Sequence, residues 1–193
     1  GGHSSAQGGP DSRRRPNARR LIGLLRNSGS MPEFLAIVRE HAATLSHQEV
    51  NAAAGCLAKS GPHHWWDPTK SSVGMEVFGL LRGRIPALLA EMDARTVSNL
   101  LHSFAKLHAA GKVRSLDGVV EELVCRVGEL LQTHAAEFKS MNVSMTLWAL
   151  AKLSTTQDGQ LKVEGDLMGA LMGCATIADD YVPQGIANVL WAL

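Results

Sequence analysis

Aromatic residues and cysteines are scarce in this sequence, and it contains no long hydrophobic run. Only 5% of the 193 residues are aromatic. No apolar run reaches the roughly 18 to 20 residues that a bilayer-spanning helix needs, so we predict no membrane insertion. The three cysteines, Cys56, Cys125 and Cys174, lie far apart, form no CxxC pair and leave an odd count. This spacing argues against both a disulfide framework and a zinc finger.

The motifs of common enzyme active sites are missing as well. There is no glycine-rich phosphate loop, no nucleophile elbow and no carboxylate pair with supporting residues. The adjacent His63 and His64 lack a third ligand at a spacing that suits zinc. We therefore expect a protein that is not an enzyme, with no metal, no cofactor and no small-molecule substrate.

Charge is distributed unevenly along the chain. Residues 1–29 carry six arginines and a single acidic residue, Asp11, within a formal net charge of +1 for the whole chain. Residues 30–193 therefore carry a net charge of −4. Nucleic-acid binding needs Lys and Arg on the surface that meets the phosphates, and the bulk charge of residues 30–193 does not supply it.

The N-terminal segment is rich in Gly, Ser, Pro and Arg and has no apolar periodicity. We expect residues 1–18 to form a flexible Arg-rich arm or the remnant of an organelle transit peptide. A polybasic arm of this kind binds ribosomal RNA or another polyanion with little sequence preference; a plain import signal and a solvated tail are the alternatives. The arginines of this cluster are Arg13, Arg14, Arg15, Arg19 and Arg20.

The apolar pattern is helical along almost the whole remaining chain. Apolar residues recur at spacings that place them on one face of a helix, most clearly in segments 21–25, 34–38, 77–89 and 119–131. No segment alternates apolar and polar residues long enough to indicate a strand. The sequence therefore predicts an all-α fold.

An internal repeat is the strongest signal in the sequence. Four segments align without gaps at periods of 47, 46 and 43 residues, and one further helical segment lies between consecutive copies. Helix pairs of this size stack so that neighbours bury each other's faces, and we expect residues 19–193 to form a right-handed α-solenoid of about four repeats, the last truncated. The copies are 50–59, 97–106, 143–152 and 186–193, with Leu57, Phe104, Leu150 and Leu193 as equivalent positions.

The two faces of the repeated helix differ in chemistry. Residues within about 60° of Leu150 are mostly apolar and are expected to pack inside the repeat. They are Val143, Thr146, Leu147 and Leu153. The far face holds Met145, Trp148 and Lys152 in the third copy, Asn99, His102 and Lys106 in the second, Asn188 and Trp191 in the fourth, and Ala52, Gly55 and Lys59 in the first.

The far face supplies the candidate RNA-binding residues. Lys59, Lys106 and Lys152 recur once per unit and could contact successive phosphates, while Asn99 and Asn188 could read base edges. The alternative is that these lysines lie near helix C-termini, where a cation offsets the macrodipole and caps carbonyls. That explanation needs no ligand.

The tryptophans have two interpretations. Trp148 and Trp191 share one repeat position, where a base could stack on the indole or where the ring could fill the groove between consecutive repeats; we favour packing. Trp65 and Trp66 lie together in a proline-bounded segment and are candidates for a protein interface.

Two segments carry a resemblance to a known family. Leu-Trp-Ala-Leu-Ala-Lys-Leu at 147–153 and Asn-x-Leu-Trp-Ala-Leu at 188–193 resemble the octotricopeptide repeat family and the related FAST-kinase-like and RAP-domain proteins. The similarity extends over roughly residues 30–193. It implies an α-solenoid that binds transcripts in mitochondria or chloroplasts and stabilises, processes or translates them. Some members of these families serve as structural components of organellar ribosomes.

The sequence thus leads to one expected function and two alternatives. The expected function is non-catalytic binding of organellar mRNA or rRNA, in the mitochondrion or alternatively the chloroplast. The first alternative is a structural component of an organellar ribosome or another large assembly, packed on rRNA and proteins, which the charge of −4 over residues 30–193 favours. The second is a protein-binding scaffold without RNA.

Overall fold

A computed structural model describes residues 17–59, 72–116, 118–156, 165–177 and 183–192. These residues form nine α-helices and three short 3-10 helices, with no strand among them, which confirms the predicted all-α class. None of the described helices is long and apolar enough to cross a membrane. The α-helices are α1 (Ala18–Asn27), α2 (Met31–His41), α3 (His47–Ala58), α4 (Val73–Arg84), α5 (Ala94–Ala109), α6 (Val119–His134), α7 (Ser140–Thr156), α8 (Gly165–Ile177) and α9 (Pro183–Ala192), and the 3-10 helices are η1 (Ala42–Thr44), η2 (Pro86–Glu91) and η3 (Ala135–Glu137).

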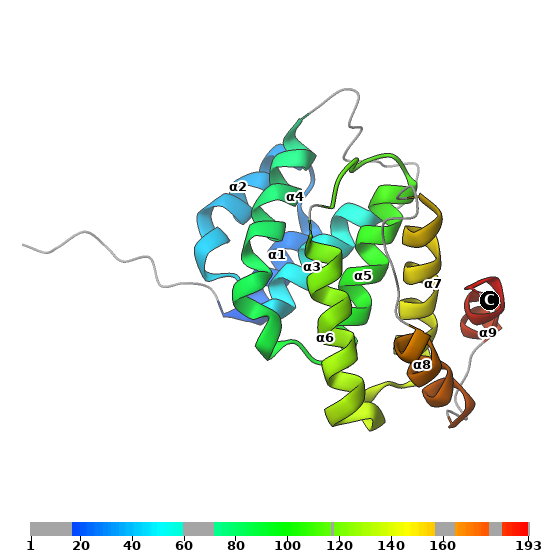
Figure 1. Ribbon diagram of the computed structural model, residues 1–193. Coiled ribbons are helices and arrows are strands. Elements are labelled where there is room, and N and C mark those ends of the chain that lie inside the picture. Colours follow the sequence, from blue (N-terminus) through cyan, green and yellow to red (C-terminus); the bar gives the residue numbers. More distant parts are fainter. Residues whose placement is uncertain (1–16, 60–71, 117, 157–164, 178–182, 193) are drawn as a thin grey trace, which may run out of the picture.

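The contacts between helices arrange them in two rows, and Figure 1 shows α2 at the left end of the molecule and α9 at the right. Helices α1, α3, α5, α7 and α9 form the odd row, in which each helix contacts the next. Helices α2, α4, α6 and α8, with the 3-10 helices, form the even row, where η2 joins α4 to α6. The described residues of the four repeat copies all lie in the odd row, on or at the end of α3, α5, α7 and α9, and an even-row helix lies between consecutive copies.

Polar residues at the helix starts explain where several helices begin. The side chain of Asn17 accepts a hydrogen bond from the backbone N–H of Arg20 at 2.9 Å and so caps α1. Ser46 and Glu49 form a reciprocal capping box at the start of α3. Asp93 accepts from the backbone N–H of Thr96 at 2.7 Å at the start of α5. These side chains satisfy N–H groups that have no partner inside the helix.

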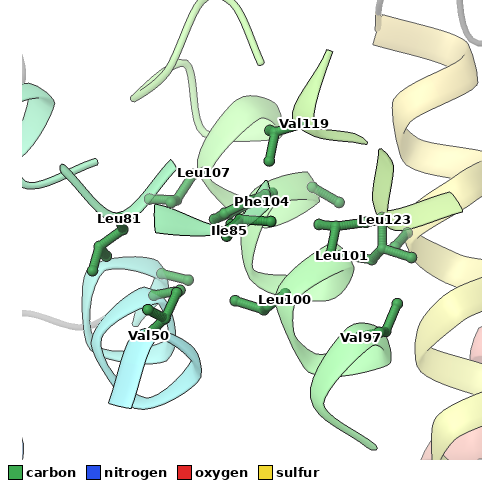
Figure 2. Close-up of a cluster of buried hydrophobic side chains, with 14 of the residues drawn as sticks. Val50, Leu81, Ile85, Val97, Leu100, Leu101, Phe104, Leu107, Val119 and Leu123 are labelled. Carbon is green, nitrogen blue, oxygen red and sulfur yellow. The ribbon is translucent and has the colours of Figure 1, made fainter. Parts of the chain in front are cut away.

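The centre of the core is built from helices of both rows. Figure 2 shows Val50 of α3, Leu81 of α4, Phe104 of α5 and Leu123 of α6 directed into one cluster, and all four are fully buried. The rings of Phe78 and Phe104 meet edge to face, with centroids 5.3 Å apart. Because burying a side chain of this size is worth about 1.5–3 kcal/mol, this cluster holds the two rows together.

The inner face of the repeated helix packs as the helical period of the sequence predicts. Val143, Leu147, Leu150 and Leu153 are all buried. Thr146 is buried with them, and its hydroxyl donates to Ser98 Oγ at 2.9 Å, which ties α7 to α5. The Ser98 hydroxyl in turn donates to the carbonyl of Ala94 at 2.7 Å. This inner face therefore combines apolar packing with a satisfied polar link between consecutive repeats.

A second repeated feature lies just before the odd-row helices, outside the four aligned segments of the sequence. Leu45, Met92 and Phe138 are buried just before α3, α5 and α7, at the same 47- and 46-residue spacing as the repeat. Arg84 Nε donates to the carbonyl of Leu45 at 3.0 Å, and Arg126 donates to the carbonyl of Met92 at 3.1 and 3.2 Å. An even-row arginine thus satisfies the backbone carbonyl of the buried residue before α3 and of the one before α5.

Candidate nucleic-acid interface

Positive charge is concentrated on the odd row. Within the described residues, and with the capping residues Lys59 of α3 and Asp93 of α5 included, this row carries seven Lys or Arg residues and two acidic residues. Of the two acidic residues, Glu49 is buried in the capping box of α3, and Asp93 caps the start of α5. The odd row therefore presents a basic surface. Its cations are Arg19, Arg20, Arg26, Lys59, Arg95, Lys106 and Lys152.

The even row has the opposite charge. Its described α-helices and 3-10 helices carry nine acidic residues and four arginines. Arg39 pairs with Glu76 at 2.6 Å, and Arg84 and Arg126 are engaged with backbone carbonyls. The acidic balance of residues 30–193 is thus concentrated on the even row and does not cancel the charge of the odd row locally. The acidic residues are Glu33, Glu40, Glu76, Glu91, Glu121, Glu122, Glu129, Glu137 and Asp166.

Two adjoining hollows lie over the odd row. The first, between α5, α7 and α9, has a volume of about 490 Å³ and is lined by His102, Lys106, Met145, Trp148 and Asn188 among others. We call it the aromatic hollow. The second, between α1, α3 and α5, has a volume of about 220 Å³ and we call it the polar hollow. Met145 lines both, so the two hollows are neighbours on one surface.

His102 and Trp148 form the wall of the aromatic hollow. Their ring centroids are 4.7 Å apart with an angle of 49° between the planes. Trp148 is half-buried and packs against the core, as the packing interpretation of this position expects. Burial, with a smaller contribution from the charge of Lys106, lowers the pKa of His102 to about 4, and its Nδ1 is buried without a hydrogen-bond partner. At neutral pH the imidazole is therefore uncharged.

The polar side chains of the polar hollow come from α1, α3 and α5. Arg26 lies in the last turn of α1 and Lys59 ends α3, and the amides of Asn51 and Asn99 and the hydroxyl of Ser103 also line the hollow. Cys56 lies between them; burial raises the pKa of its thiol, although Lys59 and Arg26 act in the opposite direction. Among the described residues, no acidic side chain lines either hollow. The polar hollow can therefore bind an anion with charged and amide donors.

The structure brings four of the five far-face candidates to these hollows. Lys59 and Asn99 line the polar hollow, and Lys106 and Asn188 line the aromatic hollow. Lys152 is half-buried on α7 and lines neither. Arg19 and Arg20 are exposed on α1. Outside the described part of the chain lie Arg13, Arg14, Arg15, Trp65, Trp66 and the side chain of Trp191.

The helix-terminus explanation fits two of the three lysines. Lys59 follows α3 as its C-cap and Lys106 lies in the last turn of α5, whereas Lys152 lies before the last turn of α7. Macrodipole capping alone therefore does not account for a cation at all three repeat positions.

Two residues of the polar hollow, Arg26 and Asn51, were not predicted from the sequence. Arg26 precedes the first aligned copy, and Asn51 lies beside the far-face positions that the repeat comparison used.

Within the described residues, no group of three or more His, Cys, Asp or Glu side chains could hold a metal ion. No protein-family model matches the chain, and the comparison with curated proteins finds no match.

Proposed function

We propose that this chain is a non-catalytic, RNA-binding helical-repeat protein whose odd row binds a single strand of organellar RNA. The observation that carries the proposal is the separation of charge between the rows, with two hollows and seven cations on the basic one. Binding of this kind serves to stabilise, process or translate a transcript.

The surface matches the requirements of a single strand. Phosphates need cations on the surface that meets them, and local potential, more than net charge, attracts a polyanion. Packed helices lie about 8–10 Å apart, so cations from consecutive odd-row helices recur along the row at intervals of that order. Lys59 and Lys106 lie beside hollows that also carry the amides of Asn99 and Asn188.

The architecture within this proposal is a right-handed α-solenoid of helix pairs. It is supported by the contacts between helices within each row and by the buried residues Leu45, Met92 and Phe138, which recur at the repeat spacing. The resemblance of segments 147–153 and 188–193 to octotricopeptide repeats, together with the Arg-rich residues 1–18, supports an organellar location, with the mitochondrion preferred to the chloroplast.

The acidic even row favours one second candidate, a structural component of an organellar ribosome. In that role the odd row packs on rRNA, while the nine acidic residues of the even row face basic proteins. A free RNA-binding factor binds isolated RNA tightly, whereas a ribosomal component requires its neighbouring proteins for stable binding.

The test is the salt dependence of binding to single-stranded RNA. We expect the full chain to bind and the triple variant Lys59→Ala, Lys106→Ala, Lys152→Ala to lose about two units of the slope of log K against log salt. The reason is that each lysine that meets a phosphate of a single strand contributes about 0.7 to this slope through counterion release.

The matched control removes three positive charges from elsewhere in the chain. Arg39 and Arg82 lie on the even row and Arg114 follows α5, so replacing all three by Ala changes the net charge equally. We expect this control to keep the wild-type slope within about one unit. Absence of RNA binding by the full chain, or equal losses in the two triple variants, would overturn the proposal.

A further inference from the structure

The aromatic hollow has a largely apolar lining, whereas a surface that binds only phosphates is lined by charged and polar groups. The ring pair of His102 and Trp148 and the side chain of Met145 form its apolar surface, and Met141 at its edge is 61% exposed. Lys106 contributes the only charged side chain among the described lining residues. A volume of about 490 Å³ falls in the range of pockets that hold a small planar ligand.

Comparison of the two hollows shows that the aromatic wall is specific to one of them. Gly55, which lines the polar hollow, occupies the repeat position of Trp148, and a Cβ added there would meet no atom within 4 Å. Open space in the polar hollow therefore stands where an indole stands in the aromatic hollow. The two hollows offer a bound strand different chemistry at equivalent repeat positions.

We propose that the aromatic hollow takes one unstacked nucleobase of the bound strand. The base lies against the His102–Trp148 pair, its neighbouring phosphate meets Lys106, and the amide of Asn188 faces its edge. This inference rests on the proposed RNA-binding function and deepens it, because it adds a base contact to a surface otherwise matched to phosphates.

Charge complementarity favours a base over an apolar side chain of a partner protein. The aromatic hollow adjoins the polar hollow through Met145, and Arg26 and Lys59 line the latter. A polyanion that follows the odd row passes both hollows, whereas an apolar anchor makes no use of these cations. A neutral imidazole beside an indole also suits a flat π-system, and stacking on an aromatic side chain is tolerant of base identity.

The experiment compares two strands of equal length and charge. The full chain is titrated with a homopolymeric single-stranded RNA about 12 nucleotides long, a length typical of single-strand binding sites, and with the same ribose–phosphate backbone lacking every base. Because every position is abasic in the second strand, sliding cannot restore the contact. We expect wild-type protein to bind the base-bearing strand about 5- to 150-fold more tightly, the range that loss of one stacked base gives.

Variants separate stacking from charge and from folding. Trp148→Ala is expected to abolish the preference for bases, and Trp148→Phe to keep most of it, because phenylalanine retains a stacking ring. Lys106→Ala is expected to weaken both strands equally. Gly55→Trp places an indole in the polar hollow and is expected to raise the preference above that of wild type, an outcome that loss of folding cannot produce.

The outcomes distinguish this inference from the proposed function. Equal binding of the two strands by wild type would overturn the nucleobase site and assign the aromatic hollow to another occupant, such as an apolar side chain of a protein, while leaving RNA binding intact. Failure to bind either strand would overturn both. A preference for bases that persists in Trp148→Ala and is unchanged in Gly55→Trp would also refute the site.

Discussion

Acidification is predicted to destabilise the fold through His102. Its pKa in the folded protein is about 4, against an ordinary value of 6.5, because burial in the α5–α7 contact and the charge of Lys106 disfavour the imidazolium. As the pH falls below 6.5, the unfolded chain binds a proton that the folded chain still excludes. The free energy of unfolding therefore decreases between about pH 6.5 and pH 4 and is unaffected by this group above that window.

The size of this effect follows from the two pKa values. One pKa unit corresponds to about 1.36 kcal/mol, so the full difference between 6.5 and about 4 would lower the free energy of unfolding by about 3 kcal/mol. His102 is half-buried and lines an open hollow, so solvent screens part of this energy. We expect a loss of about 1–2 kcal/mol between about pH 7 and pH 4.

The assay is urea-induced unfolding of wild type and His102→Phe across that pH range. Phenylalanine keeps a ring against Trp148 but does not titrate, and all other ionisable groups are shared by the two proteins. The variant is expected to lose about 1–2 kcal/mol less than wild type on acidification. Parallel pH profiles of the two proteins would refute the burial and neutrality of this imidazole.

Three further predictions concern the fold that supports the basic surface. Phe104→Ala is expected to cost about 3–5 kcal/mol, because this fully buried ring joins α5 to α4, and Phe104→Leu distinctly less; a loss below about 1 kcal/mol in chemical denaturation would contradict this packing. Arg126→Met is expected to cost about 1–3 kcal/mol, because the carbonyls of Ala90 and Met92 lose their guanidinium donors; unchanged stability would show that those hydrogen bonds are unimportant. Asp93→Ala is expected to cost about 1 kcal/mol through loss of the α5 N-cap. Partial burial alone would raise the pKa of Asp93, but hydrogen bonds from Thr96 and the nearby His47 and Arg95 lower it overall. The difference in the free energy of unfolding between Asp93→Ala and wild type is therefore present above pH 3.8 and disappears as the pH falls below that value. A difference that persists in acid would contradict a charged cap.

Much of the helical framework was predictable from the sequence because local patterns determine it. The repeat copies predicted odd-row helices, and the burial of Val143, Leu147 and Leu150 follows from the helical period. Asn99 and Lys106 lie on one face of α5 as predicted, but they are seven residues apart, which separates them by about 10 Å along the helix axis. They therefore line different hollows rather than one site.

The features that the sequence analysis missed depend on contacts between distant segments. Arg84 and Arg126 reach carbonyls 39 and 34 residues away in the sequence, and no local pattern marks such contacts. The separation of charge was hidden for a similar reason. A sum over residues 30–193 gives −4, but even-row and odd-row segments alternate along the chain, and most of the described acidic residues lie on the even row.

The proposal that RNA lies on the odd row is tested most directly by mapping where RNA touches the chain. Single-stranded RNA that carries 4-thiouridine is photo-crosslinked to the full protein, and the modified residues are identified by mass spectrometry. We expect adducts on α5, α7 and α9, centred on the aromatic hollow at Trp148 and Met145. Adducts confined to the even-row helices α2, α4, α6 and α8, or equal labelling of the two rows, would contradict it.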